Sequence, residues 1–516
     1  MSNQKFLDAI QAGYAFKGTA IDLGTAMLQG ECVSGAMVRI PLKTMNRHGL
    51  IAGATGSGKT KTLQVLAEQL AAQGTPCLLM DIKGDLSGIA ISGTSNPKIM
   101  ERHAKIGIPY FEKGNTIELM TISDQPGVRL RATITEFGPV LFSKILGLND
   151  TQGGIVAIIF KYCDDKKLPL IDLQDMKRVL QFLTNEGKSE IETTYGAVSS
   201  TTVGTILRKI VELEQQGAAI FFGEPSFEVE DFCRMDENGN GVINVIRLTD
   251  LQDRPKLFST FMLQLLAELY ATLPEEGDVE QPKLAVFIDE AHLVFNEASE
   301  ALLQQIETII KLIRSKGVGI FFITQNPADI PDAVLGQLGL KIQHALRAFT
   351  AKDRKAIKLA AENYPISEFY DTENLITELG IGEALVTALS ERGTPTPLAH
   401  TLLRAPQSRM DVLSEGEINT IVSHSALVRK YSQTIDRESA YELLSQKLAV
   451  AQSEEHIKET KKSTSKSAPE EKSIIEQVLT SSTTRSVANT VVREVTRGLL
   501  GVLGIGGSRR RKGGLF

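Results

Sequence analysis

Short apolar runs alternate with amphipathic helical patterns along most of the chain, starting near residue 48. The runs are followed by polar or acidic residues, as is typical of buried strands in an α/β sheet. Helix-length patterns between the runs predict strands joined by helices. We therefore expect core strands at residues 48–52, 76–81, 241–248, 284–289, 317–324 and 382–389.

Changes in pattern divide the rest of the chain. Residues 1–45 are Gly-punctuated and partly alternating, which predicts a small β-rich N-terminal element. The core then falls into two parts, 46–128 and 218–406, separated by a mostly helical insertion at 129–217. A helical C-terminal segment is predicted at 407–459, with a helix from 437 to about 461.

The last segment, 460–516, has a different composition. Ser and Thr supply 12 of the 27 residues from 460 to 486, which predicts a flexible linker. An amphipathic pattern at 488–503 predicts a last helix, and the basic run 509–512 follows it. Residues 456–516 hold 12 Lys or Arg against 5 Asp or Glu, although the whole chain has a net charge of −6. A mildly acidic body therefore ends in a flexible, basic tail.

Length and composition exclude several classes of protein. The chain has 516 residues, 42% of them hydrophobic, enough for a large buried core. No apolar run approaches the roughly 20 residues that span a bilayer, and the start does not resemble a secretory signal. The four cysteines are far apart and form no CxxC pair, so we expect neither a disulfide framework nor a zinc site. These features favour a cytoplasmic protein without an integral membrane segment.

The sharpest motif matches the pattern GxxxxGK[ST] between a predicted strand and a predicted helix. Glycines let backbone N–H groups close around phosphate oxygens, and the helix N-terminus adds partial positive charge. In this pattern Lys59 reaches the β- and γ-phosphates and the Thr60 hydroxyl coordinates Mg²⁺. The sequence predicts an ATP and Mg²⁺ site whose nucleotide-binding residues are Gly53, Ala54, Thr55, Gly56, Ser57, Gly58, Lys59 and Thr60.

Two further strand ends complete a candidate hydrolytic site. The strand at 284–289 ends in two acids, of which Asp289 can hold Mg²⁺ and Glu290 can deprotonate the attacking water. Such a water-activating acid favours a hydrolase over a small-molecule kinase. The strand at 317–324 is followed by Gln325, which we expect near the γ-phosphate, where it could sense hydrolysis. Residues 289–292 also spell Asp-Glu-Ala-His, the box of a different helicase superfamily, but no second phosphate loop accompanies them.

Taken together, these motifs resemble the HerA/FtsK superfamily of P-loop ATPases, and specifically its HerA-like bacterial helicase group. The resemblance covers most of residues 48–406 and rests on segments 48–60, 80–88, 286–290, 314–319 and 323–327. Segments 136–143 and 146–152 are similar to the helical insertion of this group and of type IV secretion ATPases. The resemblance to this superfamily implies an α/β fold with a RecA-like core, a homohexameric ring, and ATP-driven movement of double-stranded DNA through the pore of the ring. Related members work with a nuclease partner.

The resemblance also implies an arginine that completes the site of a neighbouring subunit. Arg314 matches the family's arginine before the glutamine strand and is the first candidate, with Arg347 and Arg354 as alternatives. Asp81, Lys83 and Asp85 follow the second strand. They could lie beside the Mg²⁺ ligands, link to a ring neighbour, or be an ordinary solvated strand end.

Three functional classes remain open at this point: a DNA translocase or helicase, an ATPase that drives protein transfer or secretion-type assembly, and a nucleotide-gated scaffold. The first is favoured, because the resemblance implies duplex DNA as the cargo.

Overall fold

The computed structural model describes residues 3–277, 279–295, 300–348, 350–433, 435 and 437–450. These residues divide into two compact units, one formed by the described residues within 3–131 and 225–433 and the other by those within 132–224 and 435–450. The predicted linker, last helix and basic run lie outside the described residues. None of the described helices is long and apolar enough to cross a membrane.

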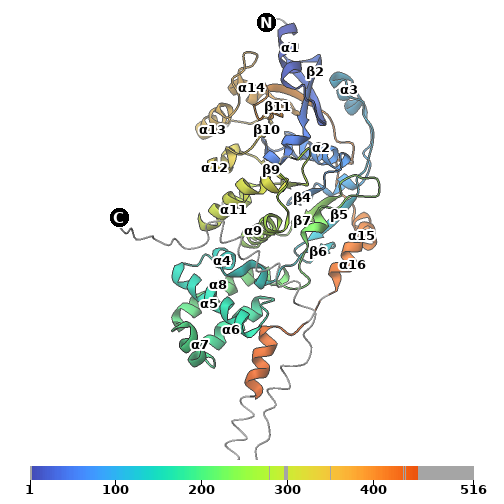
Figure 1. Cartoon of the computed structure of the whole chain (residues 1–516). Coiled ribbons are helices and arrows are strands. Elements are labelled where there is room, and N and C mark those ends of the chain that lie inside the picture. Colours follow the sequence, from blue (N-terminus) through green and yellow to red (C-terminus); the bar gives the residue numbers. More distant parts are fainter. Residues whose placement is uncertain are drawn as a thin grey trace, which may run out of the picture. The chain divides into compact units, whose positions relative to one another are not determined.

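The first unit is built on one sheet that contains all twelve strands of the described residues (Figure 1). Across the sheet the order is β2-β1-β12-β11-β10-β3-β9-β8-β4-β7-β5-β6. The strands are β1 Ala20–Leu28, β2 Glu31–Pro41, β3 Gly49–Ala52, β4 Cys77–Asp81, β5 Ile117–Thr121, β6 Val128–Arg129, β7 Ile243–Arg247, β8 Leu284–Ile288, β9 Val318–Thr324, β10 Leu340–Gln343, β11 Glu383–Thr387 and β12 Ala399–Leu403.

From β10 to β6 every pairing in this order is parallel, whereas β11, β12, β1 and β2 pair antiparallel. Parallel neighbours have their carboxyl ends at the same edge, which is where ligands bind in open α/β sheets. All six core strands predicted from the sequence are present. The α/β prediction is confirmed. Strands β5, β10 and β12 were not predicted.

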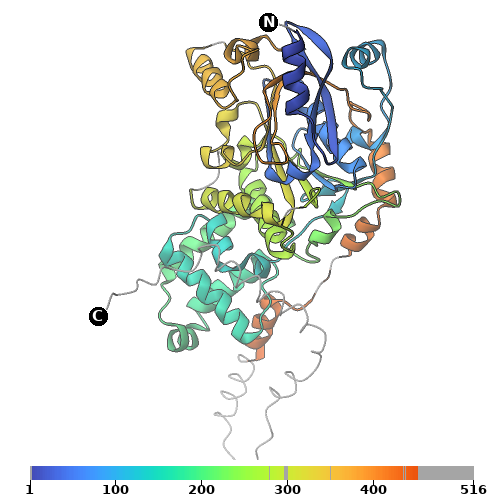
Figure 2. The same cartoon turned by 45° about the horizontal axis from the view of Figure 1, so that its top comes forward.

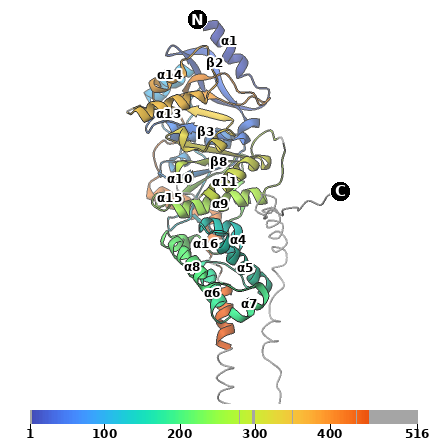
Figure 3. The ribbon, with the colours of Figure 1, turned by 90° about the vertical axis from the view of Figure 1, so that its left-hand side faces the viewer.

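Helices α9 and α11 of the first unit lie side by side (Figures 1 and 3). The helices of the unit are α1 Asn3–Gly13, α2 Lys59–Ala72, α3 Pro97–Ile106, α9 Pro255–Thr272, α10 His292–Phe295, α11 Glu300–Ile313, α12 Asp332–Leu335, α13 Ala351–Glu362, α14 Thr372–Glu378, α15 Glu415–His424 and α16 Ala426–Ser432.

The N-terminal segment is β-rich as expected, because β1 and β2 form a hairpin, but it also contains a helix that was not predicted. Helix α1 lies along the hairpin (Figure 2) and buries Phe6 and Ile10. Strand β1 pairs with β12, so the hairpin extends the main sheet instead of forming a separate sheet.

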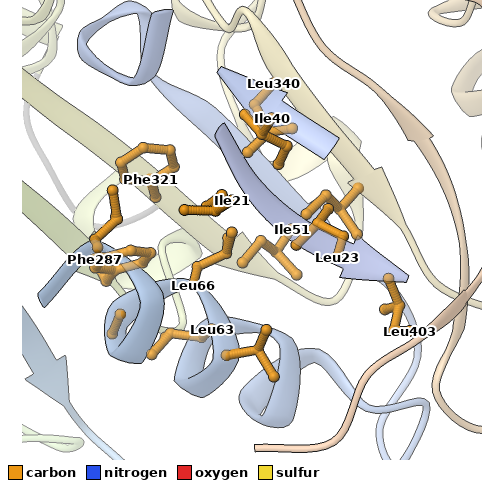
Figure 4. Close-up of a cluster of buried hydrophobic side chains, with 14 of the residues drawn as sticks. Ile21, Leu23, Ile40, Ile51, Leu63, Leu66, Phe287, Phe321, Leu340 and Leu403 are labelled. Carbon is orange, nitrogen blue, oxygen red and sulfur yellow. The ribbon is translucent and has the colours of Figure 1, made fainter. Parts of the chain in front are cut away.

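A continuous hydrophobic core fixes the phosphate-loop helix against this sheet. Leu63 and Leu66 of α2 pack in the same buried cluster as Ile51 of β3 (Figure 4). In neighbouring β8 and β9, the rings of Phe287 and Phe321 stack with centroids 4.8 Å apart. Because these side chains are almost completely buried, the strands and α2 cannot shift independently without opening voids.

The second unit is helical in its described residues, in agreement with the predicted insertion. It contains α4 Ile134–Ile145, α5 Asp150–Lys166, α6 Leu173–Thr184, α7 Lys188–Tyr195 and α8 Ser200–Gln215, which gather in one bundle (Figure 1). Residues 440–450 are also helical, and the backbone N–H of Tyr441 donates to Asp175 of α6 at 2.8 Å. The predicted helix at 437–461 is therefore confirmed over 440–450, although it begins three residues later than predicted, and residues 451–461 lie outside the described residues.

Candidate functional site

The phosphate-loop motif forms the turn between β3 and α2, as the sequence predicts. The loop is fixed to both neighbouring strands by backbone hydrogen bonds. The Gly53 N–H donates to the Thr324 carbonyl at 3.2 Å, and the Ala54 N–H donates to the Ala345 carbonyl at 2.7 Å. Beyond the loop, α2 begins at Lys59, so its first N–H groups, which have no intrahelical partner, open onto the loop.

Glycine is required at two positions of this loop for different reasons. A Cβ atom on Gly53 would lie 2.5 Å from the His344 Cβ, so a larger residue would push the loop away from the sheet. Gly58 has φ 115°, a conformation that L side chains rarely adopt, and it is the residue from which α2 starts. These constraints give the loop one shape, a concave turn of backbone amides suited to phosphate oxygens.

Lys59 lies within the loop, with its ammonium group turned toward the loop backbone. Its Nζ donates to the carbonyls of Gly53 at 2.7 Å and Ala54 at 3.1 Å, and the residue is buried. Burial lowers the pKa of Lys59, and the nearby charge of Lys83 lowers it further, whereas Glu290 and Asp289 raise it. These charges act on one another, so Lys59 and the two acids share one site.

The two acids sit at the carboxyl end of β8, which is separated from β3 only by β9. The Ala291 N–H donates to the Ile323 carbonyl of β9 at 2.9 Å and so fixes the turn that follows the acids. Asp289 and Glu290 are both buried. Burial raises the pKa of Asp289 to about 6, an effect that the charge of Lys83 opposes.

A cation and an imidazole flank Glu290. Lys83, from the loop after β4, forms an ion pair with Glu290 Oε1, and His292 Nδ1 lies 3.1 Å from Glu290 Oε2. Burial works against the charge of Lys83, but the contact with Glu290 and the charges of Asp289 and Glu290 outweigh it and raise the pKa of Lys83. Neither contact was predicted from the sequence. The role of Lys83 was left open, and the Asp-Glu-Ala-His motif at 289–292 was interpreted as a chance match.

Gln325 lies directly after β9 and touches the phosphate loop. Thr55 Oγ1 donates a hydrogen bond to Gln325 Oε1 at 3.3 Å. Both residues are exposed, so the amide is accessible to solvent. The structure therefore brings the phosphate loop, Gln325 and the two acids to one edge of three adjacent strands.

Arg314 lies at the opposite edge of the sheet from these residues. It begins the short turn before β9, and the seven residues of β9 span about 23 Å. Its charge acts on His48, at the amino end of β3. Arg314 is exposed, and the length of β9 separates it from the Glu290 of its own chain.

The two alternative arginines differ in their surroundings. Arg347 donates to the carbonyls of Thr377 at 2.6 Å and Leu379 at 3.4 Å, contacts that fasten the end of α14. Arg354 is exposed on α13. Arg347 therefore has a structural task within its own chain.

The residues present fit a magnesium nucleotide. Asp289 Oδ2 is buried and has no hydrogen-bond partner among the described residues, as expected of an oxygen reserved for a cation or its water. Thr60 is the second residue of α2 and is half-buried, so its hydroxyl lies at the helix N-terminus that opens onto the loop. In the described residues no group of three or more His, Cys, Asp or Glu side chains could by itself hold a metal ion. A cation here would therefore depend on phosphate oxygens as well.

His344 is a residue of the site that sequence reasoning did not single out. It follows β10, its N–H donates to the Ala52 carbonyl at 2.7 Å, and its Nε2 lies 2.9 Å from the Thr62 hydroxyl. Burial lowers the pKa of His344 to about 4, so the ring is neutral at pH 7. Through these contacts with Ala52, just before the loop, and Thr62, in the helix after it, His344 supports both ends of the phosphate loop. A single histidine after a short strand carries no sequence signal for this role.

A solved structure shares the fold of this chain. The bacterial conjugative coupling protein TrwBdeltaN70, in its trigonal form with sulphate, matches 80% of this chain and 95% of its own, with a TM-score of 0.51. The two sequences are 14% identical. At this identity the match concerns the fold alone.

Curated relatives of similar sequence are archaeal proteins described as DNA double-strand break repair helicase HerA. The protein of Sulfolobus acidocaldarius is 22% identical over 362 residues, and that of Saccharolobus solfataricus is 23% identical over 354. Each alignment covers 68% of this chain, and 64% and 63% of the respective relative. The chain thus spans somewhat less than two thirds of these relatives' length.

A family model described as Helicase HerA-like C-terminal matches residues 27–511. The match takes in the phosphate loop, the two acids and the glutamine strand, and it extends over far more than half of the chain. The resemblance drawn from the motifs is therefore confirmed, and the chain belongs to the HerA-like helicase family.

Proposed function

We propose that the protein binds ATP with Mg²⁺ and hydrolyses it. The observation that carries this proposal is the convergence of Lys59, Gln325 and Glu290 at the carboxyl ends of β3, β9 and β8. A polyphosphate on the loop would place its terminal phosphate between the Lys59 ammonium and the acids. Such an arrangement supplies cationic stabilisation, a base and a polar contact on one side of the nucleotide.

Glu290 would serve as the base for the attacking water. It is buried beside the phosphate site, which excludes bulk solvent and strengthens its interactions. Thr60 and Asp289 would hold Mg²⁺, whose chemistry is to neutralise charge on the phosphate oxygens. Gln325 would report the state of the γ-phosphate to the loop that follows β9, through its contact with Thr55.

The proposed functional assembly is a ring, for which we expect six copies of the chain. Support comes from the position of Arg314, which lies far from its own chain's Glu290 and faces outward. In a head-to-tail ring each copy presents the same surface to its neighbour, so Arg314 of one copy can complete the site of the next. An arginine in this role stabilises the charge on the transferring phosphoryl group.

Double-stranded DNA is the cargo that we propose for the ring. Support comes from family membership and from relatives described as DNA double-strand break repair helicases. A nuclease or other protein partner follows from the same resemblance and is part of the same proposal. The net charge of −6 offers no general attraction for DNA, so contacts would have to be local.

The test is the steady-state ATPase rate with and without duplex DNA over a range of salt concentrations. We expect duplex DNA to raise the rate, and the stimulation to fall steeply with salt because phosphate contacts release counterions. The Lys59→Ala variant provides the background rate. An ATPase that is active but indifferent to DNA at low salt would contradict the DNA proposal, and would favour protein transfer.

A further inference from the structure

The ion pair between Lys83 and Glu290 joins two segments that are far apart in the sequence. Lys83 lies in the loop after β4, and Glu290 lies after the adjacent strand β8. The side chain of Glu290 is 7% exposed, whereas that of Lys83 is 35% exposed. The buried carboxylate of Glu290 is thus paired with a lysine whose side chain remains partly exposed to solvent.

The loop that carries Lys83 is held in a defined shape. The Asp81 carboxylate accepts hydrogen bonds from the backbone N–H groups of Gly84 at 2.7 Å, Asp85 at 3.1 Å and Leu86 at 3.2 Å. Gly84 has φ 79°, and a Cβ atom on it would lie 2.8 Å from the Thr249 side chain. The Ile82 carbonyl accepts from Gln252 at 3.0 Å. Lys83 therefore projects from a rigid support.

Glu290 is constrained on its other sides as well. Its backbone has φ 47°, which is uncommon for a residue other than glycine and costs free energy unless the surroundings enforce it. The N–H of the following residue, Ala291, is bonded to β9, and His292 Nδ1 lies 3.1 Å from Glu290 Oε2. Lys83 beside Oε1 and His292 beside Oε2 thus flank the carboxylate at ion-pair distance, although neither Glu290 oxygen has a partner with hydrogen-bond geometry among the described residues.

We propose that Lys83 is a positioning residue that holds the Glu290 carboxylate in the orientation in which it accepts a proton from the attacking water. The inference rests on the hydrolytic function proposed above. Without Lys83 the carboxylate would lose the ammonium that fixes Oε1, and a displacement of a base by about 1 Å can cost on the order of a hundredfold in rate. Lys83 acts through Glu290 and, in this account, is not a ligand of the nucleotide.

The competing role for Lys83 is direct binding of the phosphates, because its charge also acts on Lys59 in the phosphate loop. The two roles predict different kinetics. A phosphate ligand contributes to the affinity for ATP, whereas a residue that only orients the base changes turnover and leaves affinity intact. A residue that acts solely through Glu290 also has no effect once Glu290 has been replaced.

The experiment measures ATP affinity and single-turnover hydrolysis for Lys83→Ala, Lys83→Arg, Glu290→Gln and the double variant Lys83→Ala/Glu290→Gln, all in the full-length chain. We expect Lys83→Ala to lower turnover at least tenfold with affinity changed less than about threefold. Arginine should restore most of the rate, because it can pair with the carboxylate. The double variant should be no slower than Glu290→Gln alone.

Several results would overturn the inference. One is normal turnover by Lys83→Ala, and another is a loss of ATP affinity that accounts for its loss of rate. A double variant markedly slower than Glu290→Gln would also show that Lys83 acts independently of the base. If Lys83→Ala does not fold, Lys83→Arg and Lys83→Gln take its place. Normal turnover by Glu290→Gln would instead refute the proposed function itself, whatever Lys83 does.

Discussion

Thr55 of the phosphate loop and Gln325 after β9 are joined by a hydrogen bond of 3.3 Å between the hydroxyl and the side-chain carbonyl. The bond connects the loop after β3 to the loop after β9, two segments whose strands lie in register, with Ala52 opposite Thr324. A change at the terminal phosphate can therefore reach the backbone after Gln325 through a single contact.

We expect Gln325→Ala to slow ATP turnover by one to two orders of magnitude while leaving ATP affinity within about threefold. The reason is that Gln325 is proposed to sense only the terminal phosphate, whereas the phosphate loop binds the rest of the polyphosphate. The measurement is single-turnover hydrolysis together with equilibrium binding of ATP. Thr55→Val is the matched variant, since it removes only the partner hydroxyl and should have the smaller effect. Unchanged turnover in Gln325→Ala would exclude the residue from the site.

Replacement of Lys59 should abolish nucleotide binding. In Lys59→Ala the phosphates lose the ammonium that lies in the loop, and we expect the affinity for ATP to fall at least a hundredfold, since charge-assisted contacts to phosphate are strong. The control is Lys61→Ala on the same helix, because Lys61 Nζ donates to the Met410 carbonyl and not to the loop. The comparison is made by titration with ATP and Mg²⁺, and equal affinities in the two variants would contradict the assignment of Lys59.

The proposed action of Arg314 on a neighbour predicts complementation. Subunits carrying Arg314→Ala and subunits carrying Glu290→Gln should each be inactive alone. In mixed rings a site can combine the Glu290 of one variant with the Arg314 of the other, so equal mixing should restore about a quarter of the sites. ATPase rates after mixing and re-assembly measure this, with Arg354→Ala as a parallel variant. No recovery, with intact rings, would exclude Arg314 as the residue supplied by the neighbour.

His48 predicts a pH dependence of stability. Its Nε2 faces the Ile310 carbonyl at 2.8 Å and its Nδ1 accepts from the Ile320 N–H at 3.0 Å. Burial lowers the pKa of His48 to about 4, against about 6.5 in an unfolded chain. Between these values the unfolded state binds more protons, so the free energy of unfolding rises with pH, by up to about 3 kcal/mol from this group.

The measurement compares melting temperatures of the protein and of His48→Gln at pH 5 and pH 7.5. We expect the protein to gain more from the higher pH than the variant does, because glutamine does not titrate. The rest of the chain, including His344, is the same in both proteins and cancels in the comparison. Equal pH responses would show that His48 is not held neutral by burial.

The sequence predicts the parts of the site that follow from local pattern. The motif at 53–60 fixes a strand, a loop and a helix, and the strand ends at Glu290 and Gln325 follow from apolar runs that stop at polar residues. The motif and the strand ends can be recognised because each is determined by residues that are close together in the sequence. The order of strands confirms that they meet, because β9 lies between β3 and β8.

Contacts between distant segments leave no such local pattern. The pairing of Lys83 with Glu290 depends on β4 lying beside β8, and the support given by His344 depends on β10 lying beside β3. Helix α1 was missed because its short amphipathic pattern gains stability from packing on the hairpin of β1 and β2. Strand β6 has two residues, which is too short for a periodic signal.

We propose above all that ATP is hydrolysed at the carboxyl ends of β3, β9 and β8, with Glu290 as the base. The most direct measurement compares the protein with Glu290→Gln in the presence of Mg²⁺, following both ATP binding and single-turnover hydrolysis. We expect the variant to bind ATP with nearly normal affinity and to hydrolyse it at least a hundredfold more slowly, because its general base has been removed. Hydrolysis at a near-normal rate by Glu290→Gln would contradict it.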